Sequence, residues 1–302
     1  MTTLKDRLKQ GKDARKQCSR NAQAMHGKTD RDPLPLIKAS SAGRIRSLNE
    51  LRFGRMLVSP FAFYRGNALL HAHDLSGTPD MGLHSTICGD CHLMNFGGFG
   101  TPERNLLFSV NDFDEVHPGP WEWDLKRLVA SFLVALLTDD QERPLFLQLK
   151  EARRSVLADY VKAKSRIRHN GQRVVEGQRL MQSASDLFLG WTTSPNGQHF
   201  YVRQLRDMKI SAELETFDAE TFSAYGHICG KALARAHAKA SGQAAQISGY
   251  IGKSDVMADA LFKYAKAYSD QNKRDFERFQ QACRKGKLQA RSEADFAADH
   301  LP

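Results

Sequence analysis

Two short segments of the chain carry a dense set of carboxylate and amide side chains. The first is Cys88-Gly-Asp-Cys-His-Leu-Met-Asn95, and the second, about twenty residues later, is Asn111-Asp-Phe-Asp114. Asp90 and Asn95 stand five positions apart. This spacing is typical of a phosphotransferase catalytic loop, in which the aspartate takes the proton of an acceptor hydroxyl and the asparagine holds magnesium. We expect the fold to bring both segments to one site.

Each polar residue of the two segments has an expected role. As a hypothesis, Asp90 is the general base, and Asn95 and Asp112 bind magnesium. Asp114 is the alternative metal ligand, because both aspartates lie in one extended segment. Magnesium takes a few hard oxygen ligands and shares the rest of its shell with phosphate. His92 is expected to orient the loop through a hydrogen bond, since magnesium prefers oxygen to imidazole nitrogen.

The same residues allow other interpretations. Cys88-x-x-Cys91-His92 fits the pattern of covalent haem attachment. We expect no haem, because that chemistry belongs to exported proteins and the first thirty residues contain no apolar run of a signal peptide. We expect no zinc either, because no second cysteine pair follows. The plainest alternative makes the two thiols small buried groups and the acidic residues turn or cap residues.

The composition restricts the function classes. The chain has 302 residues, 41% of them hydrophobic, and its longest apolar stretch is about six residues, so no membrane span is expected. Five scattered cysteines without an export signal indicate a reduced, cytoplasmic protein. The net charge is +10, and residues 1–55 hold 14 Lys and Arg against 5 Asp and Glu. No aromatic residue precedes Phe53 in this arm, so we do not expect nucleic-acid binding to be the main role.

Periodicity and turn residues predict a helix-rich chain with a few short strands. Apolar positions recur at helical spacing after Trp123, and Ser194-Pro-Asn-Gly197 is a strong hairpin signal. The expected helices are 1–24, 123–137, 155–166, 173–183, 219–240 and 255–282. The expected strands are 84–88, 106–111, 145–149 leading into Lys150, 186–191 and 199–203. Residues 27–43 and 97–100 are expected to be a loop and a flexible turn.

Arg65 follows an aromatic cluster, Phe61-Ala-Phe-Tyr64. A guanidinium beside such a cluster is a candidate phosphate contact. The alternative is a structural arginine that caps the edge of the core.

Six stretches together resemble a bacterial group known as domain-of-unknown-function family 2252. They are residues 59–66, 88–97, 111–115, 118–127, 148–152 and 201–207. That family is similar to protein kinase-like and aminoglycoside phosphotransferase-like proteins, but with the parts in a different order. The nucleotide-lobe elements follow the catalytic-type loop in this chain, whereas they precede it in a kinase. The resemblance therefore implies a circularly permuted arrangement.

The resemblance implies an α+β, two-lobe, kinase-like fold that is helix-rich and has a small antiparallel sheet. Its expected parts are a basic leader (1–57), a segment with the catalytic loop and metal site (58–137), nucleotide-lobe-like strands and a helix (138–209), and the completion of the helical lobe (210–302). Lys150 would neutralise the α- and β-phosphates of ATP, and Glu176 would pair with it. The implied cofactors are Mg²⁺ and ATP.

The sequence departs from the family pattern at one place, and this departure leaves more than one function open. A glycine-rich stretch normally precedes the lysine strand, but Leu137-Thr-Asp-Asp-Gln-Glu-Arg-Pro-Leu145 contains no glycine. The backbone amides that would cover the phosphates are then missing. The first expectation remains an ATP-dependent phosphotransferase with an unknown hydroxyl acceptor. The alternatives are a catalytically inactive nucleotide- or partner-binding relative and a magnesium-dependent phosphate-ester hydrolase. The sequence leaves the acceptor and the oligomeric state open.

Overall fold

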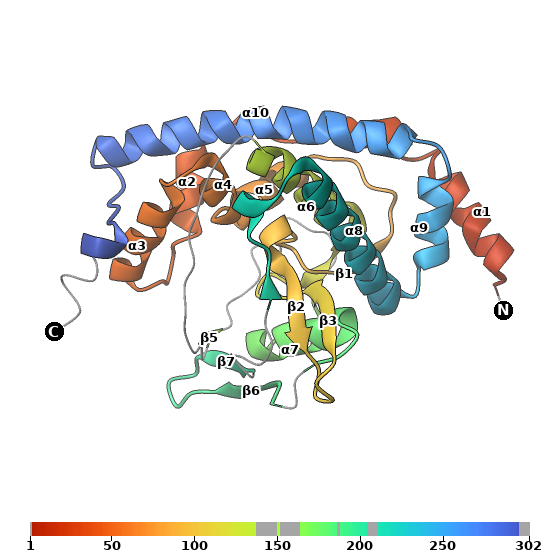
Figure 1. Cartoon of the computed structure of the whole chain (residues 1–302), viewed down its shortest axis with the longest axis horizontal. Helices are drawn as coiled ribbons and strands as arrows, with labels where there is room; N and C mark the ends of the chain where they lie inside the picture. Colours follow the sequence, from red (N-terminus) through yellow and green to blue (C-terminus); the bar gives the residue numbers. More distant parts are fainter. Residues whose placement is uncertain (1, 137–149, 152–163, 186–187, 204–209, 296–302) are drawn as a thin grey trace.

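The computed structural model describes residues 2–136, 150–151, 164–185, 188–203 and 210–295, with only the backbone at 150–151. The chain is an α+β protein in which helices predominate (Figure 1). The long helix α10 (Val256–Arg284) runs along one side of the molecule, and the strands lie on the other side of the helical layer beneath it. Among the described helices, none combines the length and the apolar character needed to cross a membrane.

The remaining helices fall into three groups along the chain. The N-terminal helices are α1 (Leu4–Ala14), η1 (Arg20–Ala24), α2 (Pro33–Ala39), α3 (Arg46–Met56), α4 (Pro60–Arg65) and α5 (Ala68–Leu75). The middle of the chain contributes η2 (Leu93–Asn95), α6 (Trp121–Leu136) and α7 (Asn170–Met181). The C-terminal helices before α10 are η4 (Leu214–Thr216), α8 (Ala219–Ser241) and α9 (Ala244–Ile251).

The strands form three small antiparallel sheets among the described residues. The first pairs β1 (His84–Ile87) with β4 (His117–Pro120). In the second, β2 (Phe96–Gly100) lies between β3 (Leu106–Val110) and β8 (Ile210–Ser211). In the third, β7 (His199–Val202) lies between β5 (Lys150–Glu151) and β6 (Gly190–Thr193). Each sheet needs cover from the helices, because two or three short strands are marginal alone.

Helix α6 crosses the centre of the main core. Leu128, Ala130 and Val134 of this helix are buried together with residues of β1, α7, α8 and α10. The turns of α6 also bury charged side chains, including Lys126 and Arg127. Such groups are rarely buried unless they are paired or hydrogen-bonded, so this helix carries more than a packing face.

Several predicted elements are confirmed. The helices expected at 123–137, 219–240 and 255–282 correspond to α6, α8 and α10. Asp218 caps α8 by accepting a hydrogen bond from the Thr221 amide at 2.7 Å. The hairpin expected at 194–197 joins β6 to β7, and Gly197 adopts a positive φ of 77°. The predicted strand 145–149 and nearly all of the predicted helix 155–166 lie outside the described residues.

Two expectations for irregular segments were wrong. Residues 97–100 are part of β2 rather than a flexible turn. A Cβ on Gly97 would lie 2.5 Å from the Ile210 carbonyl oxygen, so glycine here permits close strand contact. Residues 27–43 include helix α2, which starts where Asp32 accepts a hydrogen bond from the Leu34 amide and Pro33 occupies the first turn.

The basic N-terminal arm packs along the C-terminal helices. The Arg15 guanidinium donates to the carbonyls of Gly249 and Tyr250 at the end of α9. Arg31 is largely buried and forms ion pairs with Asp74 and Asp275, at 2.9 Å (Nε to Oδ1) and 2.7 Å. A Cβ on Gly11 would lie 1.9 Å from the Gln246 carbonyl oxygen, so α1 and α9 approach closely.

We expect Gly11→Ala to release α1 from α9. Overpacking a close contact costs about 1–3 kcal/mol, and amide exchange in α1 should become faster. Gly230→Ala on α8 is the matched control, because its added Cβ meets nothing within 4 Å and alanine favours a helix by roughly 1 kcal/mol. Hydrogen exchange and urea unfolding measure both. Unchanged exchange in α1 would contradict the tight contact.

A second expectation concerns Glu122, which is buried in the first turn of α6 and accepts a hydrogen bond from the Met81 amide at 2.9 Å. Burial raises the pKa of Glu122 from 4.5 to about 7. The folded state therefore binds the proton more tightly than the unfolded state, and this contribution to stability is lost as the pH rises from 4.5 to 7.

Glu122→Gln removes the ionisation and keeps the acceptor oxygen. Each pKa unit is worth about 1.4 kcal/mol, so relative to the wild type the variant should gain about 3 kcal/mol between pH 4.5 and 7. Urea unfolding at a series of pH values measures this difference. Glu277→Gln on the exposed side of α10 is the control and should show no such trend; a flat difference for Glu122→Gln would refute the buried titration.

Candidate functional site

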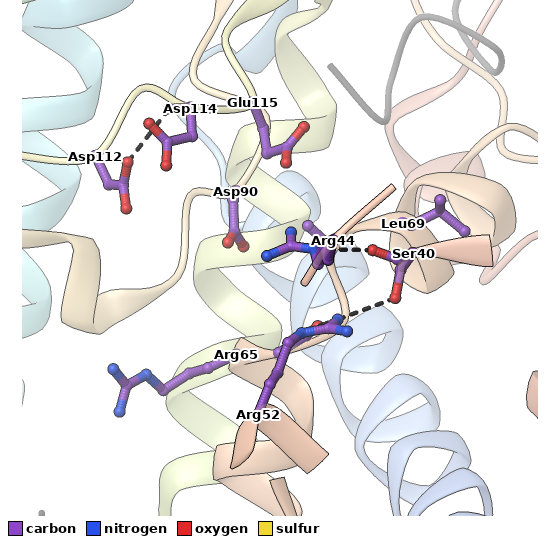
Figure 2. A pocket seen from close by; sticks show the side chains of 11 residues that line it. Ser40, Arg44, Arg52, Arg65, Leu69, Asp90, Asp112, Asp114 and Glu115 are labelled. Carbon is purple, nitrogen blue, oxygen red and sulfur yellow. Dashed lines mark hydrogen bonds between the residues drawn. The ribbon is translucent and has the colours of Figure 1, made fainter. Parts of the chain in front are cut away.

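A pocket of about 180 Å³ opens where the two polar segments meet the N-terminal helices (Figure 2). We call residues 88–95 the loop and residues 111–115 the acidic segment. The pocket is lined by Ser40, Arg44, Arg52, Arg65, Gly66, Ala68, Leu69, Asp90, Asp112, Asp114 and Glu115. The fold thus brings the predicted base and both predicted metal aspartates to one cavity, together with Arg65.

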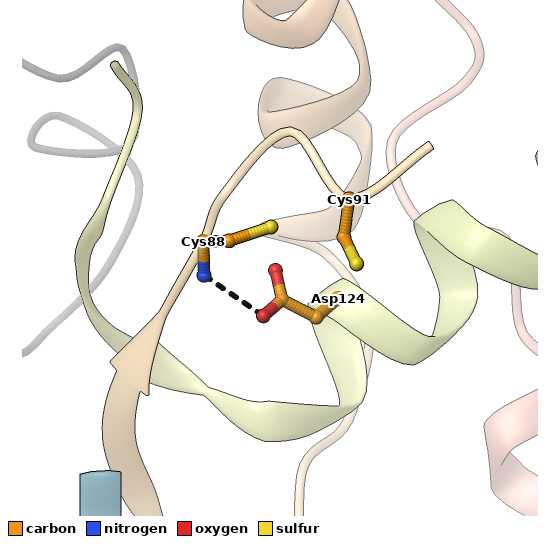
Figure 3. A group of neighbouring side chains, drawn as sticks. All are labelled: Cys88, Cys91 and Asp124. Carbon is orange, nitrogen blue, oxygen red and sulfur yellow. Dashed lines mark hydrogen bonds between the residues drawn. The ribbon is translucent and has the colours of Figure 1, made fainter. Parts of the chain in front are cut away.

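The backbone of the loop is fixed by a buried carboxylate. Asp124 in the first turn of α6 accepts a hydrogen bond from the Cys88 amide at 2.9 Å (Figure 3). It accepts a second one from the Gly89 amide, also at 2.9 Å. Gly89 has a φ of 84°, a conformation that side chains rarely adopt. His237 on α8 contacts Asp124 through Nε2 at 2.8 Å. Three elements therefore set the direction in which the next residue, Asp90, leaves the turn.

The two carboxylate oxygens of Asp90 have different surroundings. Arg127 Nε donates to Oδ1 at 2.8 Å, and Arg127 Nη2 lies 2.7 Å from the same atom. Oδ2 has no hydrogen bond among the described residues; its nearest ionic neighbour is His92 Nε2 at 3.8 Å. Burial raises the pKa of Asp90, and Asp112 adds to the rise, while Arg127 opposes it. A carboxylate with a raised pKa is a stronger base, and one of its oxygens is available to a ligand.

Arg127 is itself held on several sides. Its Nη2 donates to the Tyr64 carbonyl at 2.9 Å, and its guanidinium lies 4.1 Å from the centre of the Tyr64 ring. Tyr64 returns a hydroxyl hydrogen bond to the Arg127 carbonyl at 2.8 Å, and His71 Nδ1 lies 3.2 Å from Arg127 Nη1. A cation fixed in this way positions Oδ1 of Asp90 rather than moving with it.

Asn95 lies at the end of η2, just before β2. Its Nδ2 donates to the backbone carbonyl of Asp90 at 2.7 Å. This bond assigns the nitrogen side of the amide, so Oδ1 is the atom left for a cation. Amide and carboxylate oxygens are the ligands that Mg²⁺ accepts, so the donor types fit that ion. Asp112 and Asp114 line the pocket, whereas Asn95 is not among the residues that line it.

The acidic segment is tied to the third sheet. The Asp114 amide donates to Asp112 Oδ1 at 3.2 Å, and the Tyr201 hydroxyl on β7 donates to Asp114 Oδ1 at 2.7 Å. Burial raises the pKa of Tyr201, and Asp114 adds to the rise, so the phenol stays a donor. Arg203 donates to the Asn111 carbonyl at 2.9 Å. These contacts therefore fix the backbone that carries the two carboxylates.

His92 does not make the predicted side-chain hydrogen bond among the described residues. It is buried, and its Nδ1 has no partner among them. Burial lowers the pKa of His92 well below its ordinary value, and Arg65 and Arg127 add to the effect, so the ring is neutral. Its backbone amide holds the turn instead, by donating to the Asp90 carbonyl at 2.9 Å.

The other predicted nucleotide contacts have different outcomes. Lys150 lies in β5, opposite Tyr201 on β7, but its side chain lies outside the described residues. Glu176 lies on α7 and has Arg179 Nη1 at 3.5 Å. The predicted pairing of Lys150 with Glu176 therefore stays a prediction. Arg65 lines the pocket and forms no ion pair or hydrogen bond through its side chain among the described residues.

Sequence reasoning missed the roles of Asp124, Arg127 and Tyr201. The signal that was available is the run of charged residues at 122, 124, 126 and 127, set among the apolar positions of one helix. Charges on the buried side of a helix indicate partners in the core.

Cys88, Cys91 and Asp124 have ligand atoms within 4.8 Å of one another (Figure 3). Both oxygens of Asp124 already accept backbone hydrogen bonds. Burial raises the pKa of Cys91 to about 11, so the thiol is neutral rather than a ready metal ligand. We interpret this group as the anchor of the loop.

A protein-family model described as an uncharacterized protein conserved in bacteria (DUF2252) matches the chain over residues 44–136 and 133–282. The matched ranges include every residue that lines the pocket except Ser40. No curated protein and no solved structure matches the chain.

We expect Asp124→Asn to loosen the loop. The amide keeps one acceptor oxygen, so one of the two buried N–H groups loses its partner, at a cost of about 1–3 kcal/mol. Urea unfolding should show this loss, and hydrogen exchange at residues 88–91 should become faster. Asp270→Asn at an exposed position of α10 is the control. Slow exchange in the Asp124→Asn loop would show that another contact holds it.

Proposed function

The chain belongs to the DUF2252 family of uncharacterized proteins conserved in bacteria, and from the geometry of its pocket we propose that it is a Mg-ATP-dependent phosphotransferase acting on a hydroxyl acceptor. One observation carries the proposal. Asp90 has one oxygen held by Arg127 and the other without a hydrogen bond among the described residues, in a cavity that also contains Asp112 and Asp114. A base and a cation-binding carboxylate pair are the parts that phosphoryl transfer needs.

The proposed reaction uses the open oxygen of Asp90. Asp90 Oδ2 takes the proton of the acceptor hydroxyl while the hydroxyl oxygen forms a bond to the γ-phosphorus of ATP. The bond from that phosphorus to the bridging oxygen breaks, and ADP leaves with the electron pair. Asp90 then returns its proton to solvent. Arg127 keeps the carboxylate in place and favours its charged form before it takes the proton and after it returns it.

The cation ligands proposed are Asn95 Oδ1, Asp112 and Asp114. A bound Mg²⁺ would neutralise charge on the transferred phosphate. Tyr201 supports this assignment because its hydroxyl donates a hydrogen bond to Asp114 Oδ1 and so fixes that side chain. We propose Lys150, which lies in β5, and Arg65, which lines the pocket, as phosphate contacts. We also propose, as part of this function, that residues 138–209 form the nucleotide lobe of a two-lobe fold.

The first test is binding of ATP by calorimetry, with and without Mg²⁺. We expect magnesium-dependent binding with a Kd between about 1 µM and 1 mM, lost when Asp112→Asn is combined with Asp114→Asn. The control combines Asp259→Asn with Asp270→Asn, which removes the same charge from exposed positions of α10. Asp90→Asn should bind ATP like the wild type, because the base acts only in the transfer.

The outcomes separate the alternatives. No binding at millimolar ATP in a folded sample would refute the phosphotransferase and favour the inactive relative, which matches the absence of glycine in residues 137–145. Phosphate release from a phosphomonoester without an acceptor would favour the hydrolase. ATP binding with a slow phosphate release that falls by about 10²–10⁴ in Asp90→Asn would support the proposed base.

A further inference from the structure

Two histidine rings stack on each other where helix α7 begins. His169 is the N-cap residue of α7, and its Nδ1 accepts a hydrogen bond from the Gln172 amide at 3.1 Å. His199 on β7 accepts a hydrogen bond from the Asn170 amide through its own Nδ1, at 3.0 Å. The ring centres lie 3.9 Å apart, with 21° between the ring planes. The pair therefore supplies acceptors for two amides that the first turn of a helix leaves without a backbone partner.

These bonds decide which nitrogen of each ring carries the hydrogen. A backbone N–H donates only to an unprotonated ring nitrogen, so each neutral ring has its hydrogen on Nε2. Nε2 of His169 lies 3.0 Å from Thr193 Oγ1 on β6, to which it donates. A second proton can bind only at Nδ1, and there it removes the acceptor of the helix amide. The charged form of either ring is therefore incompatible with this cap.

Positive charge is unfavourable at this place for two further reasons. The N-terminal end of a helix carries a partial positive charge, and two charged rings stacked in this way would repel each other. Burial lowers the pKa of His169 from its ordinary value of 6.5, and the charge of His199 adds to the effect. The neutral ring of His169 therefore stabilises the fold above pH 6.5, and this contribution is lost as the pH falls from 6.5 through the lowered pKa.

The pair has no carboxylate partner among the described residues, and each ring faces the other ring across the stack. Strand β6 contributes the neutral hydroxyl of Thr193. The approach to α7 carries Arg166 and Arg168, which are exposed and add positive charge. The acidic residue of α7 itself, Glu176, lies about two turns away and has Arg179 beside it. The surroundings therefore favour neutral rings, as the cap does.

We call the contact of the first turn of α7 with β6 and β7 the joint. Both sides of the joint also hold the acidic segment. Arg173 at the start of α7 donates through Nη2 to the Asp114 carbonyl at 2.9 Å. Tyr201 follows His199 by two positions on β7, so the two side chains lie on the same face of the strand. The Tyr201 hydroxyl donates to Asp114 Oδ1 at 2.7 Å. A movement at the joint therefore reaches the acidic segment.

We propose that His169 and His199 make the joint sensitive to pH. With both rings neutral, the pair holds the first turn of α7 on β7 and keeps the acidic segment in place. Protonation breaks the amide bonds to Nδ1, opens the joint and frees the backbone of the acidic segment. Neither histidine lines the pocket, so acidification acts on the pocket from outside it. The proposal concerns the fold and does not depend on phosphotransfer.

The test follows amide hydrogen exchange of the full chain at about pH 7.5 and about pH 5, on either side of the usual histidine titration. Exchange rates are expressed as protection factors, so that the intrinsic effect of pH cancels. The test variant combines His169→Asn with His199→Asn, because asparagine is a good N-cap whose oxygen accepts amide bonds without titrating. The control combines His26→Asn with His227→Asn, which makes the same changes at exposed positions.

We expect protection at residues 170–173 and 112–116 to fall about tenfold or more on acidification in the wild type and in the control. The variant with asparagine at 169 and 199 should keep its protection within about twofold, because neither side chain can take up the proton. Nitrogen spectra of the imidazole rings give a second measurement on the wild type. At neutral pH both rings should carry the hydrogen on Nε2.

Four results would overturn the proposal. Equal protection of the wild type at both pH values would show that no joint opens. The same loss in the variant with asparagine at 169 and 199 would place the titrating group elsewhere. A hydrogen on Nδ1 of either ring at neutral pH would contradict the cap. A loss at residues 170–173 with unchanged protection at 112–116 would show that opening does not reach the acidic segment.

Discussion

The buried carboxylate of Asp124 is the contact on which the geometry of the pocket depends. A charged group in the core is tolerated only when its oxygens are hydrogen-bonded, and here the amides of Cys88 and Gly89 supply those bonds. The bonds run from the first turn of α6 to the end of β1, while His237 adds α8. The position of Asp90 is therefore set by the packing of three elements and not by the loop alone.

The same helix also fixes the side chain of Asp90. Arg127 stands one turn after Asp124 on one side of α6, since residues three apart are neighbours on a helix. Asp124 holds the loop backbone, and Arg127 holds one oxygen of the carboxylate that the backbone presents. Because Arg127 is in turn bound to the Tyr64 carbonyl, α4 joins this arrangement. A single helix thus sets both the position and the charge of the proposed base.

The sequence pattern predicted those elements that depend only on residues close to one another in the chain. The helix after Trp123 and the turn at 194–197 follow from neighbouring residues and were confirmed. The paired segments 88–95 and 111–115 were predicted to converge, and they share one pocket. The roles of Asp124 and Arg127 depend on partners more than thirty positions away, which periodicity does not reveal. The strand at Gly97 was missed for a different reason: its main partner β3 is close in the sequence, but a run of glycines is typical of a turn and weakens a strand.

The basic N-terminal arm shows that a positive net charge does not by itself indicate a binding function. Arg15 and Arg31 are used inside the fold, the first on the carbonyls at the end of α9 and the second in a buried pair of ion pairs. Arginines that are bound inside the fold cannot displace counterions from a nucleic acid. Arg15 and Arg31 therefore do not contribute to a nucleic-acid-binding surface. Arg44 and Arg52 differ, because they line a cavity beside a proposed base. Part of the excess of cations in the arm therefore docks the arm onto α9 and α10, and part of it lines the pocket.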